Sequence, residues 1–317
     1  MKKFFITLSV ISFLLLLLAF PAAALKGAKT GLMLWFQTVL PTLLPFMIVS
    51  NLMIQLQITD CLTALFAPVA RRLFGLSRFG CYPFLIGMLS GYPVGAKACS
   101  DLVRNKEITR QEGQYLLCFC NNASPMFLIS FIAAQCLGLK KKGFLVLFIV
   151  YGSAVLTGFL YRMANKPSLS VHTVSRSSCF ITKEQCPKCK ISAFAILDQT
   201  ILNAFEILVK AGGYIILFSI LAELLLHVTC LPAGIRYFLI GFLEITTGCA
   251  AISFSQLDVT KKIILTHALT AFGGLSSHAQ TYSVIMDSGL SMKTYFFYKC
   301  INACIAAILA LFLVNVL

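Results

Sequence analysis

The chain has 317 residues, of which 59% are hydrophobic and only 12% are charged, and its mean hydropathy is +0.88. Soluble domains carry roughly a quarter charged residues, so this composition excludes a disordered chain and a secreted disulfide scaffold and argues against a soluble enzyme. A membrane helix takes about 20 apolar residues, which leaves room for roughly seven to ten crossings. We expect an all-α, polytopic membrane protein.

The formal net charge is +15, from 26 Lys and Arg against 11 Asp and Glu. In a soluble protein such an excess would suggest a nucleic-acid partner. Here the basic residues lie mainly in short connections between apolar segments, as the positive-inside bias produces, and no separate basic domain exists. We therefore expect the lipid bilayer as a partner and no nucleic acid.

The N-terminus carries a signal-like segment. Lys2 and Lys3 precede an apolar run over residues 4–20, which Pro-Ala-Ala-Ala follows at 21–24. This pattern resembles a secretory signal peptide with a small-residue cleavage site. The run is also long enough to span a membrane. We expect an uncleaved anchor helix within residues 1–30, with cleavage as the alternative.

The rest of the chain divides into two membrane repeats, at 31–161 and 193–317, on either side of a basic polar loop at 162–192. The segment at 61–74 is short and ends in two arginines, which is typical of a helix at the membrane interface. Apolar runs long enough to cross the bilayer predict spans at 31–56, 115–139, 143–161, 196–228, 262–285 and 296–317.

Two shorter apolar segments, at 84–96 and 238–250, begin with the same letters, FLIG, and are interrupted by Gly, Pro and polar residues. We read both as re-entrant hairpins. The two FLIG motifs lie 154 residues apart, and the last spans of the two halves keep nearly the same offset. Duplicated halves with broken helices are typical of secondary transporters.

Charges predict how the two repeats are oriented. With the N-terminal lysines in the cytoplasm, 16 Lys and Arg lie on the cytoplasmic side and eight on the outer side, although the run 140–142 is outside. Three crossings in each half would invert the second half relative to the first. We therefore expect two inverted repeats, each of about three spanning helices plus a re-entrant hairpin, whose hairpin tips meet near the midplane.

Polar residues gather in four clusters inside the apolar segments, at 90–97, 121–125, 244–248 and 273–280. Such clusters also join helices together in membranes. Four clusters at corresponding places in two halves favour a shared solute site, because polar groups at membrane depth are costly and usually line a pathway. The candidate substrate-binding residues are Ser90, Gly91, Tyr92, Gly95, Lys97, Asn121, Asn122, Ser124, Glu244, Thr246, Thr247, Ser276, Ser277, His278 and Gln280.

Single ionisable residues allow two interpretations each. Glu206 and Lys210 have the spacing of an intrahelical ion pair, and so do Glu223 and His227. Glu244 has no such partner and is the better candidate for proton or cation coupling.

Two of the candidate residues also remain ambiguous. His278 is either titratable or a hydrogen-bonded structural residue. Lys97 either attracts an anionic solute or extends to the interface.

The 13 cysteines are scattered, and many lie in apolar stretches where a thiol behaves as a small hydrophobe. Cys179, Cys186 and Cys189, with His172 nearby, could form half of a zinc site. A second pair with matching spacing is missing, so free thiols are the better interpretation. We expect no metal and no cofactor.

Motifs spread along the chain resemble the YlbJ family of sporulation integral membrane proteins (stage V sporulation protein V type). They are LWFQTVLPTLLPF at 34–46, LSGYPVGAK at 89–97, NNASP at 121–125, GGYIILF at 212–218, GFLEITTG at 241–248 and GGLSSHAQ at 273–280. The resemblance covers nearly the whole chain except 162–192, where this chain looks short for the family.

The resemblance implies a pair of nucleoside-recognition (Gate) domains, similar to the core of concentrative nucleoside transporters. It further implies a role in spore maturation, in which dipicolinate crosses the outer forespore membrane, derived from the mother cell. Dipicolinate is a planar dianion, which exposed backbone amides, Asn121, Asn122, Ser124 and Lys97 suit chemically.

Three functions follow as expectations. The first is a transporter of a small anionic solute, dipicolinate above all, and the second is a nucleoside carrier. The third is a non-transporting assembly protein of the spore envelope. No catalytic motif such as HExxH or GxSxG occurs in the sequence, so we expect no enzyme. Association of identical chains stays open.

Overall fold

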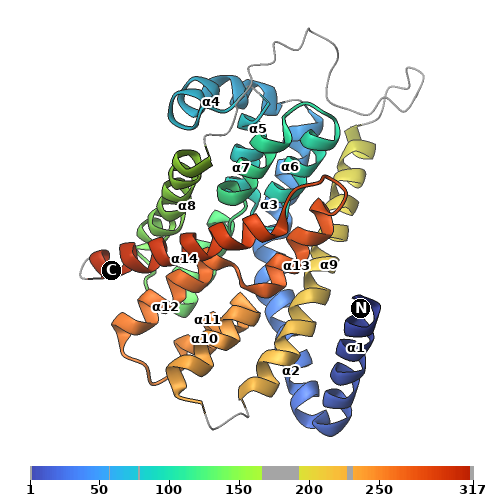
Figure 1. Ribbon diagram of the computed structural model, residues 1–317, viewed down its shortest axis with the longest axis vertical. Helices are drawn as coiled ribbons and strands as arrows, with labels where there is room; N and C mark the ends of the chain where they lie inside the picture. The colour runs from blue at the N-terminus through green and yellow to red at the C-terminus, as the bar shows by residue number, and fades with distance from the viewer. Residues whose placement is uncertain (1, 57, 78, 166–192, 227–230, 315–317) are drawn as a thin grey trace.

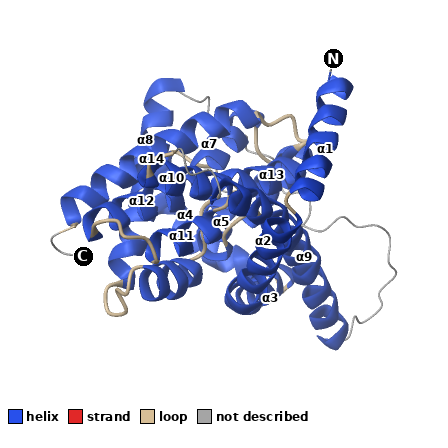
Figure 2. Cartoon of the chain, turned by 90° about the horizontal axis from the view of Figure 1, so that it is seen from below, coloured by secondary structure: helices blue, strands red, loops and turns tan. Residues whose placement is uncertain are grey.

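The computed structural model describes residues 2–56, 58–77, 79–165, 193–226 and 231–314. Within these ranges helices and their connections make up the whole structure, without a strand (Figure 2). Four helical segments are long and apolar enough to cross a membrane: Pro21–Met53, Gly143–Asn165, Phe194–Leu226 and Met292–Leu313. The predicted all-α, polytopic membrane protein is confirmed.

The first long segment begins earlier than expected. Helix α1 (Lys2–Ala19) ends before Pro21, which opens α2 (Pro21–Leu34). Proline suits the first position of a helix, where its missing N–H group would have no partner. Helix α2 continues through the π-helical turn η1 (Trp35–Val39) into α3 (Leu40–Gln55). The expected boundary near residue 30 therefore falls inside α2.

Helix α4 (Ile58–Phe74) lies across one end of the bundle, at the top of Figure 1. Its last turn carries Arg71 and Arg72. This crosswise orientation agrees with the expected interfacial segment at 61–74.

Two pairs of short helices occupy the segments predicted as hairpins. Helices α5 (Cys81–Ser90) and α6 (Val94–Arg104) form the first pair, and α10 (Ala233–Leu243) and α11 (Ile245–Ser253) form the second. Within each pair, one glycine of each helix lets the two backbones approach: Gly87 faces Gly95, and Gly241 faces Gly248. The glycine of each FLIG motif thus has the same packing role in its own half.

Each half also contains a broken helix where a span was expected. Segment 115–139 is divided between α7 (Arg110–Cys120) and η2 (Phe127–Cys136), with residues 121–124 outside any helix. Segment 262–285 is divided between α12 (Val259–Phe272) and α13 (Gly274–Ile285) at Gly273, whose φ of +93° favours glycine. Both breaks fall on the polar clusters.

The long helices complete a shared order in the two halves. The first half runs from α2–α3 through α5–α6 and α7–η2 to α8 (Gly143–Asn165). The second runs from α9 (Ala193–Leu226) through α10–α11 and α12–α13 to α14 (Met292–Leu313). The chain runs upward along α2 and α3 and downward along α9 in Figure 1, as expected for inverted halves.

Helices α2 and α9 pack closely. A methyl group built on Gly27 would lie 2.8 Å from the Cα of Ile220, and one on Gly31 would lie 2.8 Å from the Cβ of Ser219. Lys26 forms an ion pair of 2.7 Å with the buried Glu223. Glu223 therefore pairs with α2, whereas its expected partner His227 lies outside the described residues.

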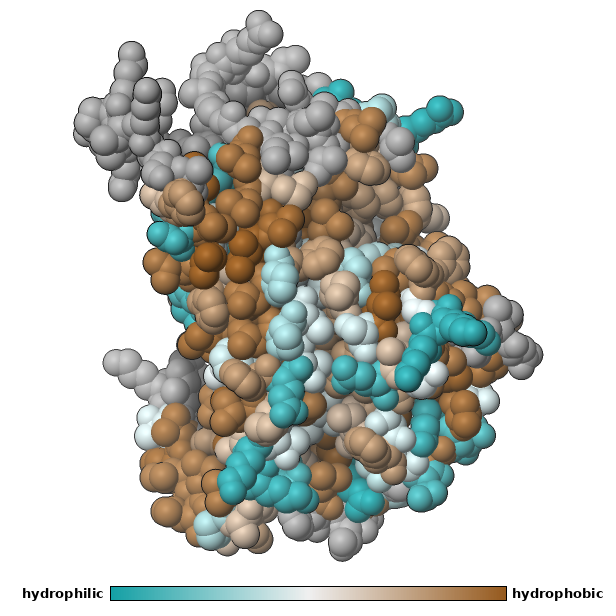
Figure 3. All heavy atoms as spheres, turned by 180° about the vertical axis from the view of Figure 1, so that it is seen from behind, coloured by the Kyte–Doolittle hydropathy of each residue, from teal (hydrophilic) through white to brown (hydrophobic). Residues whose placement is uncertain are grey.

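The surface agrees with a membrane environment. Broad patches of hydrophobic side chains cover much of the face in Figure 3, and hydrophilic side chains gather in its lower half. Many large apolar side chains of the long helices, such as Phe148 and Phe312, are exposed and suited to contact lipid. Most of the predicted polar loop, with Cys179, Cys186 and Cys189, lies outside the described residues.

Candidate functional site

The interruptions of four helical elements meet at one place. In the first half, a methyl group built on Gly91 (φ +82°) would lie 2.8 Å from the backbone nitrogen of Ser124. Across the two halves, a methyl group on Gly273 would lie 2.7 Å from the Tyr92 hydroxyl oxygen. Only glycine permits these approaches, which explains Gly91 and Gly273 in two of the clusters.

A close backbone approach also joins the two breaks of the second half. A methyl group built on Gly274 would lie 3.0 Å from the backbone nitrogen of Ile245, where α11 begins. The breaks of α5–α6, α7–η2, α10–α11 and α12–α13 therefore lie together. This is the convergence of interrupted helices that the duplicated clusters predicted.

A cavity of about 60 Å³ lies beside the four breaks. Apolar residues of η1, α3 and α9, among them Val39, Leu43, Leu208 and Ile215, form part of its wall. The remaining wall mixes polar side chains of the four breaks with Ala123, Phe127 and Ile245, and most of its exposed surface is apolar. Eight of the fifteen predicted site residues line the cavity: Gly91, Tyr92, Ser124, Glu244, Thr246, Ser276, Ser277 and Gln280.

Asn121 joins the two halves behind this wall. Its Nδ2 donates hydrogen bonds of 2.9 Å to Thr281 Oγ1 and of 2.9 Å to the Tyr295 hydroxyl. Its Oδ1 accepts a bond of 3.3 Å from the backbone N–H of Ala96. Since Asn121 is buried, these bonds satisfy an amide that would otherwise be costly. The predicted residue thus holds the breaks together.

The Lys299 side chain of α14 is fully buried at the same junction. Its Nζ donates to the Tyr92 hydroxyl (3.1 Å), to the carbonyl oxygen of Asn121 (3.3 Å) and to Asn122 Oδ1 (3.2 Å). It also lies 5.2 Å from the centroid of the Tyr92 ring. All three acceptors are neutral, and the two ion pairs among the described residues, Lys26–Glu223 and Lys210–Glu206, do not include it.

A protonated Lys299 has no counter-charge among the residues that the structure describes. Burial of an ammonium group disfavours the charge unless an opposite charge or enough hydrogen bonds compensate it. Hydrogen bonds to three neutral oxygens compensate only part of this desolvation cost. A negative charge close to Tyr92 would stabilise the protonated form of Lys299.

Lys299 belongs to a polar stripe on an otherwise apolar helix. Tyr295, Lys299 and Asn302 follow each other at steps of four and three, which places them on one face of α14. Asn302 Nδ2 donates a 3.1 Å bond to the carbonyl oxygen of Ala271, at the end of α12. Helix α14 thus reaches the breaks of both halves.

Glu244 caps the start of α11. Its Oε2 accepts a 2.5 Å bond from the backbone N–H of Thr247, and the residue is buried. A carboxylate suits this position because a helix N-terminus carries partial positive charge. The Thr247 hydroxyl in turn shares a 2.7 Å hydrogen bond with that of Ser219 on α9.

His278 lies in the packed wall of the site and does not line the cavity. Its Nδ1 lies 2.7 Å from the carbonyl oxygen of Gly274 and must donate to it, because a carbonyl can only accept. The ring packs against Phe272 and Tyr295, with centroid distances of 4.5 and 5.1 Å. These contacts match the structural interpretation of His278.

Three predicted residues of α5 and α6 lie apart from the cavity. Ser90 ends α5 and is buried, and Gly95 serves the contact with Gly87. Lys97 is exposed on α6 and is not part of the cavity wall.

Sequence reasoning missed Lys299, Tyr295, Thr281 and Asn302 as parts of the site. Lys299 stood out only as a charge inside a span. The periodic polar stripe on α14 was the available signal, since intramembrane polar residues on one helix face usually point into a bundle.

Comparison with known proteins confirms the resemblance seen in the motifs. The chain is similar to the sporulation integral membrane protein YlbJ of Bacillus subtilis (strain 168), with 27% identity over 97% of this chain and 82% of the relative. No family model matches the chain, so the pair of Gate domains stays a prediction. No solved structure matches it either.

Proposed function

We propose that the chain is a membrane transporter of a small carboxylate, dipicolinate above all, that acts in spore formation. The similarity to a sporulation integral membrane protein supports the process. We further propose that it works in the outer forespore membrane, where a solute made in the mother cell would cross toward the spore.

The buried side-chain nitrogen of Lys299 is the observation that carries this proposal. It lies behind the cavity wall, bonds only neutral oxygens, and has no carboxylate partner among the described residues. An anion that enters the cavity would supply the missing negative charge, whereas a neutral nucleoside would not. Dipicolinate, with two carboxylates on a flat ring, has the appropriate charge.

The shape of the site supports transport through a change of conformation. The cavity of about 60 Å³ is smaller than the roughly 300–1,000 Å³ of pockets that hold drug-sized ligands. A solute that needs a pocket larger than this cavity can enter only if the wall segments move apart. Four helix breaks at the cavity provide places where half-helices can move relative to each other, as in transporters built from inverted repeats.

We propose transport rather than catalysis because polar groups at the cavity are engaged in local structure. Glu244 bonds the backbone N–H of Thr247, and the Ser277 hydroxyl donates to the carbonyl oxygens of Gly273 and Gly274. A hydroxyl that donates to carbonyl oxygens is not prepared as a nucleophile by a neighbouring base.

The test is solute flux into vesicles that contain the purified chain. Uptake of dipicolinate, uridine and succinate would be compared with uptake by empty vesicles. The proposal predicts dipicolinate flux well above that of uridine. Flux of uridine alone would establish a nucleoside carrier instead, and absence of flux for every solute would favour an assembly protein of the spore envelope.

A further inference from the structure

Charged residues on α9 form a second polar feature, outside the cavity. Glu206 and Lys210 make an ion pair of 2.6 Å, and their side chains are 64% and 67% exposed. The two side chains thus form the intrahelical ion pair that their spacing predicted. It lies within Phe194–Leu226, an apolar run of 33 residues. When that run is centred on a hydrocarbon core that about 20 residues cross, both charges lie inside the core.

Two exposed charges at this depth need water. A charge in lipid costs several kcal/mol, and ionisable residues in membrane segments almost always face the bundle interior or a water-filled space. An ion pair that is open on its outer side gains little from lipid contact, so a hydrated surface is the stable alternative.

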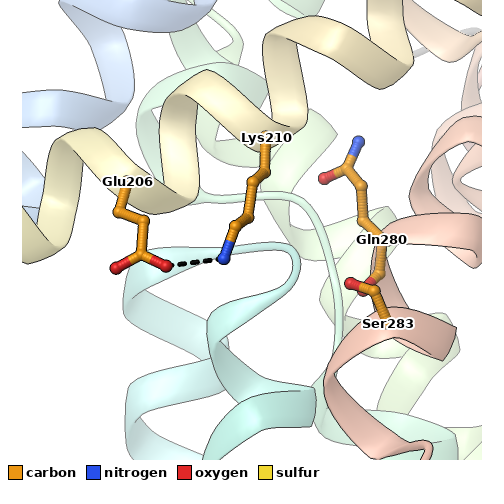
Figure 4. A network of polar contacts seen from close by, with 4 residues as sticks. All are labelled: Glu206, Lys210, Gln280 and Ser283. Carbon is orange, nitrogen blue, oxygen red and sulfur yellow. Dashed lines mark hydrogen bonds and ion pairs between the residues drawn. The ribbon is translucent and has the colours of Figure 1, made fainter.

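Two polar side chains of the neighbouring helix α13 lie on the same side of α9 as the pair. Figure 4 shows Gln280 and Ser283 of α13 on the side of α9 where Glu206 and Lys210 project. Gln280 lines the cavity, and so does Ile207, the residue next to Glu206. The pair therefore lies on the same two turns of α9 that contribute Ile207, Leu208 and Ala211 to the cavity wall.

Helix α6 adds further charges to this region. Helix α6 packs against α13, as α9 does, and carries the exposed Lys97. Asp101 and Arg104 follow on the same helix and are exposed as well. The described charges that α6 and α9 bring together here are thus three cations and two carboxylates.

We propose that the groove between α6, α9 and α13 is a water-filled mouth of the cavity whose lysines, Lys97 and Lys210, make it select anionic solutes. A positively charged entrance raises the local concentration of anions and repels cations. Lys210 can exchange the Glu206 carboxylate for a carboxylate of the solute, because both bonds are of the same kind. The anion preference rests on the proposed function, whereas access of water does not.

Thiol labelling of a cysteine in the groove tests both parts. Ser283→Cys would be placed in the full chain, in vesicles of neutral phosphatidylcholine. The modification rates with anionic sulfonatoethyl and cationic trimethylammonioethyl methanethiosulfonate would be measured, each divided by the rate of that reagent with mercaptoethanol. Peptide mass spectrometry separates the new thiol from the native ones.

The matched control is Leu217→Cys, also on α9 and 47% exposed, whose neighbours one turn away along the helix carry no charge. Ser283→Cys should react rapidly and Leu217→Cys only slowly. The normalised preference of the Ser283→Cys variant for the anionic reagent should be about tenfold. It should reverse when Lys97→Gln and Lys210→Gln are added, because the two carboxylates then outnumber Arg104. Gel filtration of each variant verifies folding.

Two results would overturn the proposal. Equal, slow labelling of both positions would show that the groove faces lipid. An unchanged preference after removal of both lysines would show that they do not select charge. Labelling as expected together with absent dipicolinate flux would refute only the transport function, because labelling requires no transported solute.

Discussion

The Lys299 ammonium donates a hydrogen bond to the hydroxyl of Tyr92, which lies 207 residues earlier in the chain. Through this contact the last helix of the second half holds the break between α5 and α6 of the first half. The same nitrogen reaches Asn121 and Asn122 at the break after α7. One cation therefore connects two interrupted elements, and its charge faces the cavity through the Tyr92 side chain.

Replacing Lys299 with Met should separate stability from transport. The substitution leaves three buried oxygens without their donor, so we expect the melting temperature to fall by a few degrees while the chain stays folded. Dipicolinate flux should fall at least about tenfold, since the counter-charge is gone. Thermal unfolding in detergent and vesicle flux would be measured on the same preparation. Full flux in Lys299→Met would contradict the role of the charge.

Asn121 and Tyr295 should be energetically coupled across the two halves. A double-mutant cycle with Asn121→Ala and Tyr295→Phe should give a coupling energy of about 1 kcal/mol, because one hydrogen bond of 2.9 Å joins them. Tyr298→Phe on the same helix is the control, since its hydroxyl accepts from Asn165 instead. If the stability effects of Asn121→Ala and Tyr295→Phe are additive, as expected for the control pair, the hydrogen bond between Asn121 and Tyr295 contributes nothing to stability.

Glycines of the helix pairs should resist substitution where backbones touch. Alanine at position 248 would overlap the Cα of Gly241, so Gly248→Ala should cost about 1–3 kcal/mol through overpacking. Gly213 on α9 has open space around its Cα, and Gly213→Ala should gain up to about 1 kcal/mol in helix propensity. Opposite shifts of the melting temperature are the expected result, and equal shifts would contradict the close approach.

Glu244 should matter for coupling more than for folding. Glu244→Gln retains a side-chain oxygen for the Thr247 N–H, so the cap on α11 and the fold should persist. The charge is lost, and we expect the dependence of flux on a proton or cation gradient to disappear. Asp258→Asn, which alters the exposed cap of α12, serves as the control. If flux through the Glu244→Gln variant depends on the gradient as it does in the wild type, the role of Glu244 is limited to capping α11.

Much of the fold could be predicted from local sequence chemistry. Apolar runs reveal the spans, and Gly273 and the polar residues 121–124 mark the breaks, because backbone conformation there depends on the residues themselves. The two FLIG motifs predicted a repeat, and their glycines have equivalent contacts. The helix that continues into the first span begins at Pro21, ten residues before the expected span, because a proline can open a helix as well as interrupt one.

The assembly of the site could not be predicted in the same way. Lys299 acquires its partners from segments more than 170 residues away, and no local pattern specifies such contacts. Conversely, Lys97 belongs to a polar motif but is exposed, because position within a cluster does not determine which face of α6 a side chain occupies. Glu223 pairs with Lys26 of α2, a partner that the spacing of residues on α9 could not predict.

The central claim is that interrupted helices of both halves surround one anionic solute. Cysteines introduced at Ser124 and Thr246, which line the cavity from the first and second halves, test it most directly. The account predicts that a small water-soluble thiol reagent labels both positions and that dipicolinate, but not uridine, slows both reactions together. Labelling that dipicolinate leaves unchanged at either position, or two thiols that never react, would contradict the account.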